Sequence, residues 1–322
     1  MKPFHSIDEQ LVKLDSRNLI ILDRQKAYRY LLTNNYYNVI NGYSKFLLDK
    51  DDMYMDGATF EEVTCIHWYD KEIKAALLTS IIEAEKHFKS VVAYRFSEKF
   101  QDAYSYLNIS NFETNGEANK ISKIAYLISI MARIIKDKTA SKQNNAIKHH
   151  INKHKSIPFW VLVNELTFGQ IYNFYVYLDN DIKDKIARDL SSFLQSNIEN
   201  RTRKTSNQII SGNTLVSILR NVIEVRNITA HNNKIFGFTC RENLPKQKWF
   251  IDSDNKTRQS VYYAFQSLQC LLSRVQYSTL HNTILSRSNR LDNKLHTITS
   301  SEINRSLGFP TDWQINTEKL KQ

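Results

Sequence analysis

The amino-acid sequence predicts a nearly all-α protein, and three observations support this fold class. Apolar residues recur at three- and four-residue intervals over long runs, whereas the alternating runs typical of strands are scarce. Only 7 Gly and 4 Pro interrupt the 322 residues. Hydrophobic residues make up 42% of the chain, which is enough to form one large core or two smaller ones.

The first helices are predicted from their N-caps. Ser6 and Glu9 form a capping-box pattern, and Asp23 can cap a second helix. Residues 34–50, with the sequence NNYYNVINGYSKFLLDK, predict a turn followed by a third helix. We interpret the tyrosines of this stretch as core residues more readily than as a base-stacking platform.

The longest predicted helix begins with a second capping-box pattern, Thr59 with Glu62, and runs to about Phe100. Its inner line consists of Val63, Ile66, Asp70, Ile73, Leu77, Ile81, Ala84, Phe88 and Val91. Asp70 therefore occupies a position that the helical period reserves for an apolar residue. Its partner is either a similarly misplaced cation or a functional site, and a buried ion pair without chemistry is an equally good alternative.

Two basic stretches follow, the first at the end of a helix predicted over residues 117–138. Residues 133–155 are the densest basic stretch, and residues 201–204 form a second. These side chains either grip RNA phosphates without sequence preference or form a solvated face or mobile loop. The candidate RNA-binding residues are Arg133, Lys136, Lys138, Lys142, Lys148, His149, His150, Lys153, His154, Lys155, Arg201, Arg203 and Lys204. His150 and His154 are four residues apart, but without a nearby carboxylate or thiol we expect no metal site.

The remaining segments are predicted more coarsely. Residues 158–178 form two short apolar helices broken at Gly169, and residues 181–207 form a polar, amphipathic connection. Two or three further helices fill residues 256–308. The tail carries the sequence GFPTDW, in which Gly and Pro force a turn and Trp313 can dock on the body of the protein.

The helix from Asn213 to His231, with the sequence NTLVSILRNVIEVRNITAH, carries an arginine that its apolar face does not explain. Asn213 is available as the N-cap. The apolar stripe consists of Leu215, Ile218, Leu219, Val222 and Val225. Arg226 lies about 20° from Leu215 around an ideal helix, in the middle of this stripe. A buried guanidinium is costly unless it is paired or faces a polar cavity.

Arg226, Asn227 and His231 carry the chemistry that we predict. RNA cleavage without a metal needs a base for the 2′-hydroxyl proton, an acid for the leaving 5′ oxygen and positive charge on the transition state. Arg226 supplies the charge as a phosphate clamp, and His231 suits proton transfer. The two residues lie about 140° apart on an ideal helix, so they converge only if the helix ends or distorts near His231. Asn227 shares a face with His231 and can orient the imidazole.

Because the site has a single histidine, we expect a second copy to supply the missing acid or base, which predicts a symmetric dimer with facing sites. The net charge of +11 and the pI of about 9.3 suit a polyanionic partner, although a basic solvated surface explains them equally well. Three widely spaced cysteines support neither a disulfide framework nor a zinc site, and they favour a reducing cytoplasm. No apolar run approaches the roughly 18 residues of a membrane span, and no signal peptide is expected.

The segment RNITAH at 226–231 resembles the R-N-x-x-x-H motif of HEPN ribonucleases. The surrounding sequence resembles the Abi (abortive infection) family, specifically its AbiF/AbiD-like group. The resemblance rests on blocks at residues 34–46, 57–97, 158–175, 225–231 and 308–313. The family pattern also matches Tyr69-Asp70, Ile82-Glu83 and Ala230-His231-Asn232, whereas Thr229 stands where a cysteine is often found.

The resemblance implies an all-helical HEPN-type bundle with additional N- and C-terminal helices. We expect an N-terminal helical segment over 1–57, a HEPN-like core over 58–246, and C-terminal helices with the GFPTDW tail over 247–322. It also implies a metal-independent endoribonuclease without a cofactor, in which Asp70 and Glu83 support the site. This toxin would act in abortive infection against phage on cellular or phage RNA, restrained by a structured non-coding RNA that serves as antitoxin.

A non-catalytic RNA-binding scaffold is the alternative from a different class of protein. In that case Arg226 and Asp70 form a buried structural pair. A DNA-binding regulator is less well supported, because no helix-turn-helix pattern stands out.

Overall fold

The computed structural model describes residues 4–231, 233–253 and 257–322, and in these ranges the fold is all-α. The described backbone forms no strand beyond three isolated bridges. The α-helices are α1 (Ile7–Asp15), α2 (Arg24–Asn34), α3 (Phe60–Lys99), α4 (Ala118–Ala140), α5 (Ala146–His154), α6 (Phe159–Leu162), α7 (Phe168–Val176), α8 (Asn180–Thr202), α9 (Gly212–Ala230), α10 (Val261–Ser267), α11 (Arg274–Asp292), α12 (Ser300–Arg305) and α13 (Trp313–Asn316). The predicted fold class is therefore confirmed.

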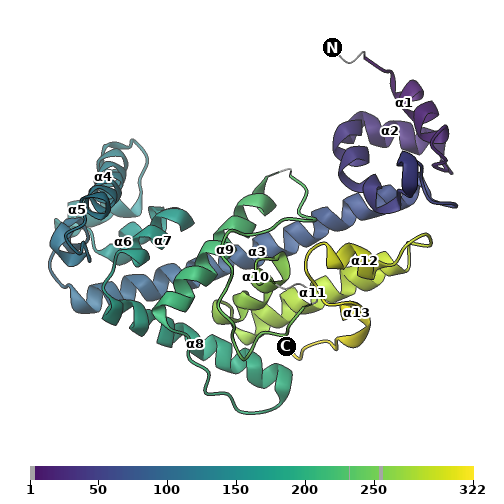
Figure 1. The fold of residues 1–322 in the computed structure, drawn as a ribbon. Helices are drawn as coiled ribbons and strands as arrows, with labels where there is room; N and C mark the ends of the chain where they lie inside the picture. The colour runs from purple at the N-terminus through teal and green to yellow at the C-terminus, as the bar shows by residue number, and fades with distance from the viewer. Residues whose placement is uncertain (1–3, 232, 254–256) are drawn as a thin grey trace.

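Helix α3 is the axis of the fold. Its 40 residues extend for about 60 Å at the usual rise of an α-helix. Figure 1 shows it running through the molecule, with α1 and α2 at its N-terminal end and α4 and α5 at its C-terminal end. Helices α8, α9 and α11 pack against it. The predicted inner line is buried from Val63 to Phe88, but it then continues through Val92, because Val91 is only half-buried.

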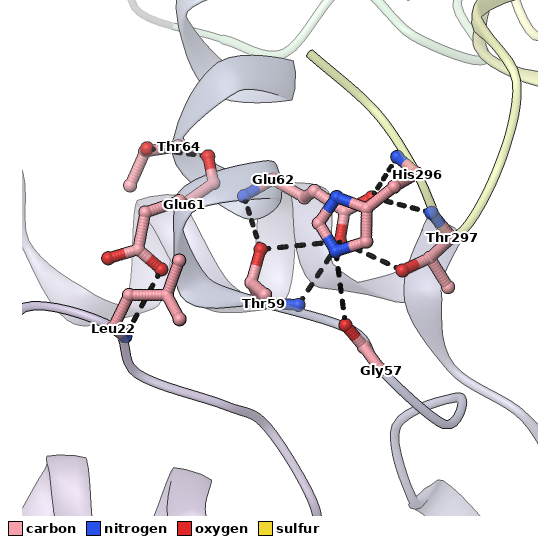
Figure 2. A network of polar contacts seen from close by, with 8 residues as sticks. All are labelled: Leu22, Gly57, Thr59, Glu61, Glu62, Thr64, His296 and Thr297. Carbon is pink, nitrogen blue, oxygen red and sulfur yellow. Dashed lines mark hydrogen bonds and ion pairs between the residues drawn. The ribbon is translucent and has the colours of Figure 1, made fainter.

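The first turn of α3 is tied to the C-terminal region through the buried Glu62. Its carboxylate accepts hydrogen bonds from the backbone N–H groups of His296 and Thr297, both at 2.9 Å, and from the Thr297 hydroxyl at 2.8 Å (Figure 2). It also completes the predicted capping box by accepting from Thr59 N at 3.1 Å. Burial alone would raise the pKa of Glu62, but these hydrogen bonds outweigh it and hold the pKa below its usual value.

Two more of the predicted helix starts are confirmed, and one predicted helix is wrong. Ser6 caps α1 in a capping box with Glu9, and Asp23 caps α2. The third helix expected within residues 34–50 is replaced by a short π-helix, Tyr37–Asn41, and a 3₁₀ turn, Ser44–Leu47. The stretch is rich in asparagine, which competes with helix formation by bonding to local backbone groups, and this accounts for the short irregular turns.

Further corrections concern segments that were assigned from glycine positions or from polarity. The break between α6 and α7 lies before Thr167, whose side chain caps α7 in a capping box with Gln170, and Gly169 lies inside α7. The amphipathic connection at 181–207 is mostly the 23-residue helix α8. The basic stretch at 133–155 is also helical, since α4 and α5 cover most of it.

The C-terminal region closes the fold as predicted. Helices α10, α11 and α12 fill the segment assigned to two or three helices. Trp313 is buried and packs edge-on against Phe309, with ring centroids 4.8 Å apart, and Gly308 has φ of +87° in the turn before it. In the described ranges, no helix combines the length and the apolarity that crossing a membrane requires.

Candidate functional site

Helix α9 carries the RNITAH segment and is fixed at its start by a close approach to α8. Its N-cap is Ser211, whose hydroxyl accepts a hydrogen bond from Thr214 N at 3.2 Å, so the predicted cap at Asn213 is wrong by two residues. Gly212 follows the cap, and a Cβ there would lie 2.8 Å from the Cβ of Lys183 on α8. A glycine is therefore required for the two helices to approach this closely.

The inner face of α9 is buried as predicted. Leu215, Ile218, Leu219, Val222 and Val225 are each at most 1% exposed. The opposite side is held by the segment 240–242. Asn221 donates to the Glu242 carbonyl at 2.9 Å, Arg220 pairs with the Glu242 carboxylate, and Arg241 N donates to Glu224 at 2.9 Å. Contacts on both faces therefore hold helix α9 in place.

Arg226 is half-buried and has no described counter-charge. Its Nε is buried without a hydrogen-bond partner among the described residues. Its Nη1 makes one long hydrogen bond, 3.4 Å, to Oδ1 of the neighbouring Asn227. No ion pair to Arg226 occurs in the described part of the chain, and within those residues its side chain donates only the one hydrogen bond to Asn227.

His231 lies just past the end of the helix. Helix α9 ends at Ala230, and His231 is its C-cap with extended backbone angles, φ −106° and ψ 162°. The imidazole is exposed, as is the Asn227 side chain. The separation of 140° on an ideal helix therefore does not apply. Within the described residues, the hydrogen bond of Asn227 goes to Arg226 rather than to the imidazole, and Asn232 of the Ala-His-Asn pattern lies outside those residues.

The segment immediately after His231 is anchored by two charged residues of α3. Asp70, which is fully buried, accepts a hydrogen bond from Ile235 N at 2.9 Å. Lys74 donates to the Asn233 carbonyl at 2.9 Å, and its Nζ lies 2.7 Å from Asp70 Oδ2. The partner of Asp70 is therefore Lys74, and the predicted pairing of Asp70 with Arg226 is wrong. Asp70 and Lys74 position the chain that leads away from His231.

Lys74 was missed in the sequence, although the signal was present. The helical period marks Asp70 as buried, but the partner sits four residues later on the same face of the same helix, where an aspartate and a lysine meet directly. Lys74 itself is only 7% exposed. The i,i+4 spacing of Asp70 and Lys74 is therefore the sequence signal of this ion pair.

Aromatic packing completes this anchor. Phe236, one residue after Ile235, lies parallel to Tyr69 with ring centroids 6.1 Å apart, and it meets Tyr43 edge-on at 5.9 Å. The Tyr69 hydroxyl lies 2.7 Å from Ser288 Oγ on α11. The Tyr69-Asp70 pair therefore holds residues 235–236 through one packing contact and one polar contact.

Glu83, the other residue expected to support the site, pairs within its own helix. Its carboxylate lies 2.6 Å from Lys86 Nζ, and this contact is the main reason why the pKa of Glu83 is lowered. Both side chains are at least one third exposed. No described contact joins Glu83 to α9.

The predicted RNA-binding residues of the first basic stretch lie on α4, α5 and the turn between them, at the opposite end of the molecule from α1 and α2 (Figure 1). Most are exposed, but Lys138 pairs with Glu165 at 2.5 Å and Lys148 donates to Ser141 O at 3.0 Å. The rings of His150 and His154 are 5.3 Å apart. Among the described residues, no group of three His, Cys, Asp or Glu side chains could hold a metal ion.

The second basic stretch, residues 201–204, begins in the last turn of α8 and continues past its end at Thr202. Arg201 is half-buried and donates to Trp249 O at 2.9 Å, so it supports the fold. Arg203 and Lys204 are exposed. Figure 1 shows the two basic stretches in different parts of the molecule.

A comparison with protein families adds to these observations. The model of the Abi-like protein family matches residues 29–237, which is more than half of the chain. The matched region begins inside α2, includes all of α3 and α9, and ends two residues after Ile235, so it contains the whole anchor around His231. Neither the curated proteins nor the solved structures contain a match to the chain.

Proposed function

The chain belongs to the Abi-like protein family, and from this premise we propose that it is a metal-independent endoribonuclease that acts in abortive infection, a bacterial defence against phage. One observation carries the proposal: Arg226 is a half-buried cation whose Nε has no partner among the described residues, and it lies five residues before an exposed histidine at a helix end. A buried cation without a counter-charge is costly, so a ligand with negative charge is the simplest reason for it.

The chemistry follows from the residue types. A base removes the proton of the ribose 2′-hydroxyl, the 2′ oxygen attacks the adjacent phosphorus, and the bond to the 5′ oxygen breaks. An acid protonates that oxygen, leaving a 2′,3′-cyclic phosphate and a 5′-hydroxyl. His231 serves as one of the two proton-transfer groups. Arg226 stabilises the charge that develops on the phosphate oxygens, and Asn227 holds the Arg226 side chain and orients the site.

The second proton-transfer group comes from a second copy of the chain in this proposal. One copy offers a single histidine at the end of α9, and that histidine is exposed and therefore free to face another copy. A symmetric dimer would place two Arg226–His231 sets together. Mass measurement in solution tests this step, and a monomer that cleaves RNA would contradict it.

The partners of the proposed enzyme are RNAs. The exposed cations of α4, α5 and the end of α8 would bind a structured non-coding RNA that restrains the activity. The substrate would be cellular or phage RNA. Binding of this kind depends on phosphate contacts, so it should weaken strongly as salt is raised.

The experiment is RNA cleavage by the purified full-length chain, stripped of nucleic acid, in the presence of EDTA. We expect cleavage by the wild type and its loss in Arg226→Ala and His231→Ala, with RNA binding close to that of the wild type. His5→Ala is the matched control, because His5 is an exposed histidine on the N-terminal segment. Equal loss of binding and cleavage in the site variants would contradict the assignment.

The scaffold alternative makes a different prediction in cells. A non-catalytic RNA-binding protein would be equally tolerated with or without His231. The proposed enzyme should be toxic when expressed without its restraining RNA, and His231→Ala should remove that toxicity.

A further inference from the structure

A polar pocket of about 430 Å³ lies beside the anchored segment that follows His231. Four parts of the chain form it: the end of α2, the π-helix Tyr37–Asn41 with the residues after it, the α3 turn that carries His67 and Lys71, and the pair Asn233-Lys234. π-Helices often occur at functional sites. We call it the asparagine pocket, since Asn34, Asn35, Asn38, Asn41 and Asn233 contribute to its wall.

The asparagine pocket is held in place relative to His231. Lys234 donates to the Gly42 carbonyl at 3.0 Å, and Lys71 donates to Asn34 Oδ1 at 3.0 Å, so each lysine ties two of the four parts together. The Asn233 carbonyl is fixed by Lys74. Two residues of extended chain span at most about 7 Å, so the backbone of His231 lies within that distance of the pocket wall at Asn233.

The lining offers the groups that recognise a nucleotide. The side-chain amides of Asn38 and Asn41 are exposed and have no hydrogen-bond partner among the described residues. An amide both donates and accepts, and it can therefore pair with the edge of a base. Tyr37 is 69% exposed at the same rim, where its ring can stack on a base.

The charge of the lining also suits a nucleotide. Lys71 and Lys234 contribute two ammonium groups, and in the described part of the chain the lining contains no carboxylate. Burial, and then the nearby charge of Lys45, lower the pKa of Lys234. Cations that are crowded in this way are stabilised by a phosphate.

His67 forms part of the wall rather than a second proton-transfer group. Its Nδ1 lies 2.7 Å from the Tyr30 hydroxyl, and its ring lies 4.9 Å from that of Tyr43. Burial, and then the charges of Lys71 and Lys74, lower the pKa of His67 to about 4. The imidazole is therefore neutral near pH 7 and adds a flat, uncharged surface to the pocket.

We propose that the asparagine pocket binds one nucleotide of the RNA next to the cleaved phosphodiester. The base lies against Tyr37 and pairs with Asn38 and Asn41, and Lys71 and Lys234 hold its phosphate. The pocket would then set the base preference of cleavage. This inference rests on the proposed ribonuclease function, because the cleaved phosphodiester is placed beside the pocket only if His231 takes part in cleavage.

The test separates binding from cleavage. Binding of a labelled, random-sequence single-stranded RNA octamer is measured with the full chain carrying His231→Ala, which prevents turnover. Adding Asn38→Ala with Asn41→Ala should weaken binding by about five-fold or more, because a base that loses a bidentate partner loses at least this factor. Asn316→Ala, an exposed asparagine on α13 that lies outside the pocket lining and outside both basic stretches, is the matched control and should leave affinity unchanged.

Cleavage mapping is the second arm. With His231 intact, the wild type should cleave next to a preferred base, and the Asn38→Ala/Asn41→Ala variant should lose that preference. Unchanged affinity together with an unchanged preference would overturn the proposal. So would a free mononucleotide that binds the pocket while the octamer does not.

Failure of the proposed function would look different. If the wild type cleaves no RNA but octamer binding still depends on Asn38 and Asn41, the pocket is supported as an RNA-binding site and the ribonuclease assignment is lost.

Discussion

Two charged side chains, the buried Glu62 at the start of α3 and the half-buried Arg226 near the end of α9, differ in how the protein satisfies them. Glu62 is 1% exposed and accepts hydrogen bonds from Thr59, His296 and Thr297, which join distant parts of the chain (Figure 2). Among the described residues, Arg226 has a buried Nε without a partner and one long hydrogen bond to Asn227. A satisfied charge stabilises the fold, whereas an unsatisfied one costs stability, and we therefore propose a ligand for Arg226.

Asp70 belongs with Glu62 in this comparison, although the resemblance to HEPN ribonucleases placed it near the chemistry. Both carboxylates lie on α3, both are buried, and both are bound by protein groups: Glu62 accepts hydrogen bonds on both oxygens, whereas Asp70 accepts one hydrogen bond on Oδ1 and pairs with Lys74 through Oδ2. What distinguishes Asp70 is where its partners lie, because they belong to the segment directly after His231. Asp70 can therefore position the proposed site although all of its described contacts are structural.

The largest expected effect is that of Asp70→Asn. The amide keeps a hydrogen-bond acceptor for Ile235 N, but it leaves the buried Lys74 ammonium without a counter-charge, which should cost about 3–5 kcal/mol. Chemical denaturation measures the loss. Asp137→Asn, an exposed aspartate on α4, is the control and should leave the free energy of unfolding nearly unchanged.

A double variant sharpens this test. Asp70→Asn with Lys74→Met removes both charges and should recover much of the lost stability. RNA cleavage should be low in Asp70→Asn and should stay low in the double variant, because the double variant also lacks the hydrogen bond from Lys74 to the Asn233 carbonyl. Recovery of both properties would show that this anchor does not position His231.

Arg226→Met should separate activity from stability. We expect RNA cleavage to fall by about 100- to 1,000-fold, the usual effect of removing a group that stabilises transition-state charge. The melting temperature should stay the same or rise, since the variant removes a buried donor that no described residue satisfies. Arg188→Met, an exposed arginine on α8, is the control. A clear loss of stability in Arg226→Met would mean that the guanidinium is satisfied after all, and the comparison with Glu62 would fail.

Glu62→Gln should have the opposite profile. Replacing the carboxylate should cost about 2 kcal/mol at pH 7, because Gln offers one acceptor where Glu62 offers two charged ones. Because the pKa of Glu62 is lower in the folded state than in the unfolded state, its contribution is complete above the unfolded pKa and is lost as pH falls through the folded pKa.

The pH dependence supplies the measurement for Glu62. The difference in unfolding free energy between wild type and Glu62→Gln should be constant from pH 7 to 5 and should shrink below the usual carboxyl range. Glu318→Gln changes an exposed carboxylate and should show no such convergence. A difference that persists unchanged at the acid end would mean that shape, and not charge, accounts for the effect.

The start of α3 and the inner face of α9 could be predicted from the sequence, whereas the N-cap of α9 could not, and the difference has a physical reason. The start of α3 and the inner face of α9 depend on local patterns, a capping box and an apolar period, and both were predicted. The N-cap of α9 was misplaced because Ser211 and Asn213 are both good caps, and only the close contact of Gly212 with α8 selects Ser211.

The environment of the site could be predicted only in part. The period identified Asp70 as buried, but Lys74 was overlooked as its partner despite the i,i+4 spacing, because a lysine on a helix is normally read as exposed. The asparagine pocket could not be predicted from the sequence, for a further reason. Its wall combines residues 32–43, His67, Lys71 and residues 233–234, and tertiary packing alone brings them together.

The smallest expected effect is that of Glu83→Ala, and it tests the comparison from the other side. Glu83 pairs with Lys86 at the surface, where the two side chains are 36% and 63% exposed. Solvent screens such a pair, so we expect no resolvable shift in melting temperature and a cleavage rate within about two-fold of the wild type. Glu85→Ala is the matched variant on the same helix. Its partner is Lys89, and these side chains are only 15% and 13% exposed, so its melting temperature should fall further.

A different result for Glu83→Ala would change the argument about Arg226. If cleavage falls by much more than two-fold while the melting temperature stays constant, a carboxylate that is already paired within α3 takes part in the reaction. The lack of a counter-charge would then no longer distinguish the residues of the proposed site from the residues that stabilise the fold. If both properties stay constant, Arg226 remains the charge for which the described residues supply no partner, which is the observation that favours the proposed phosphate ligand.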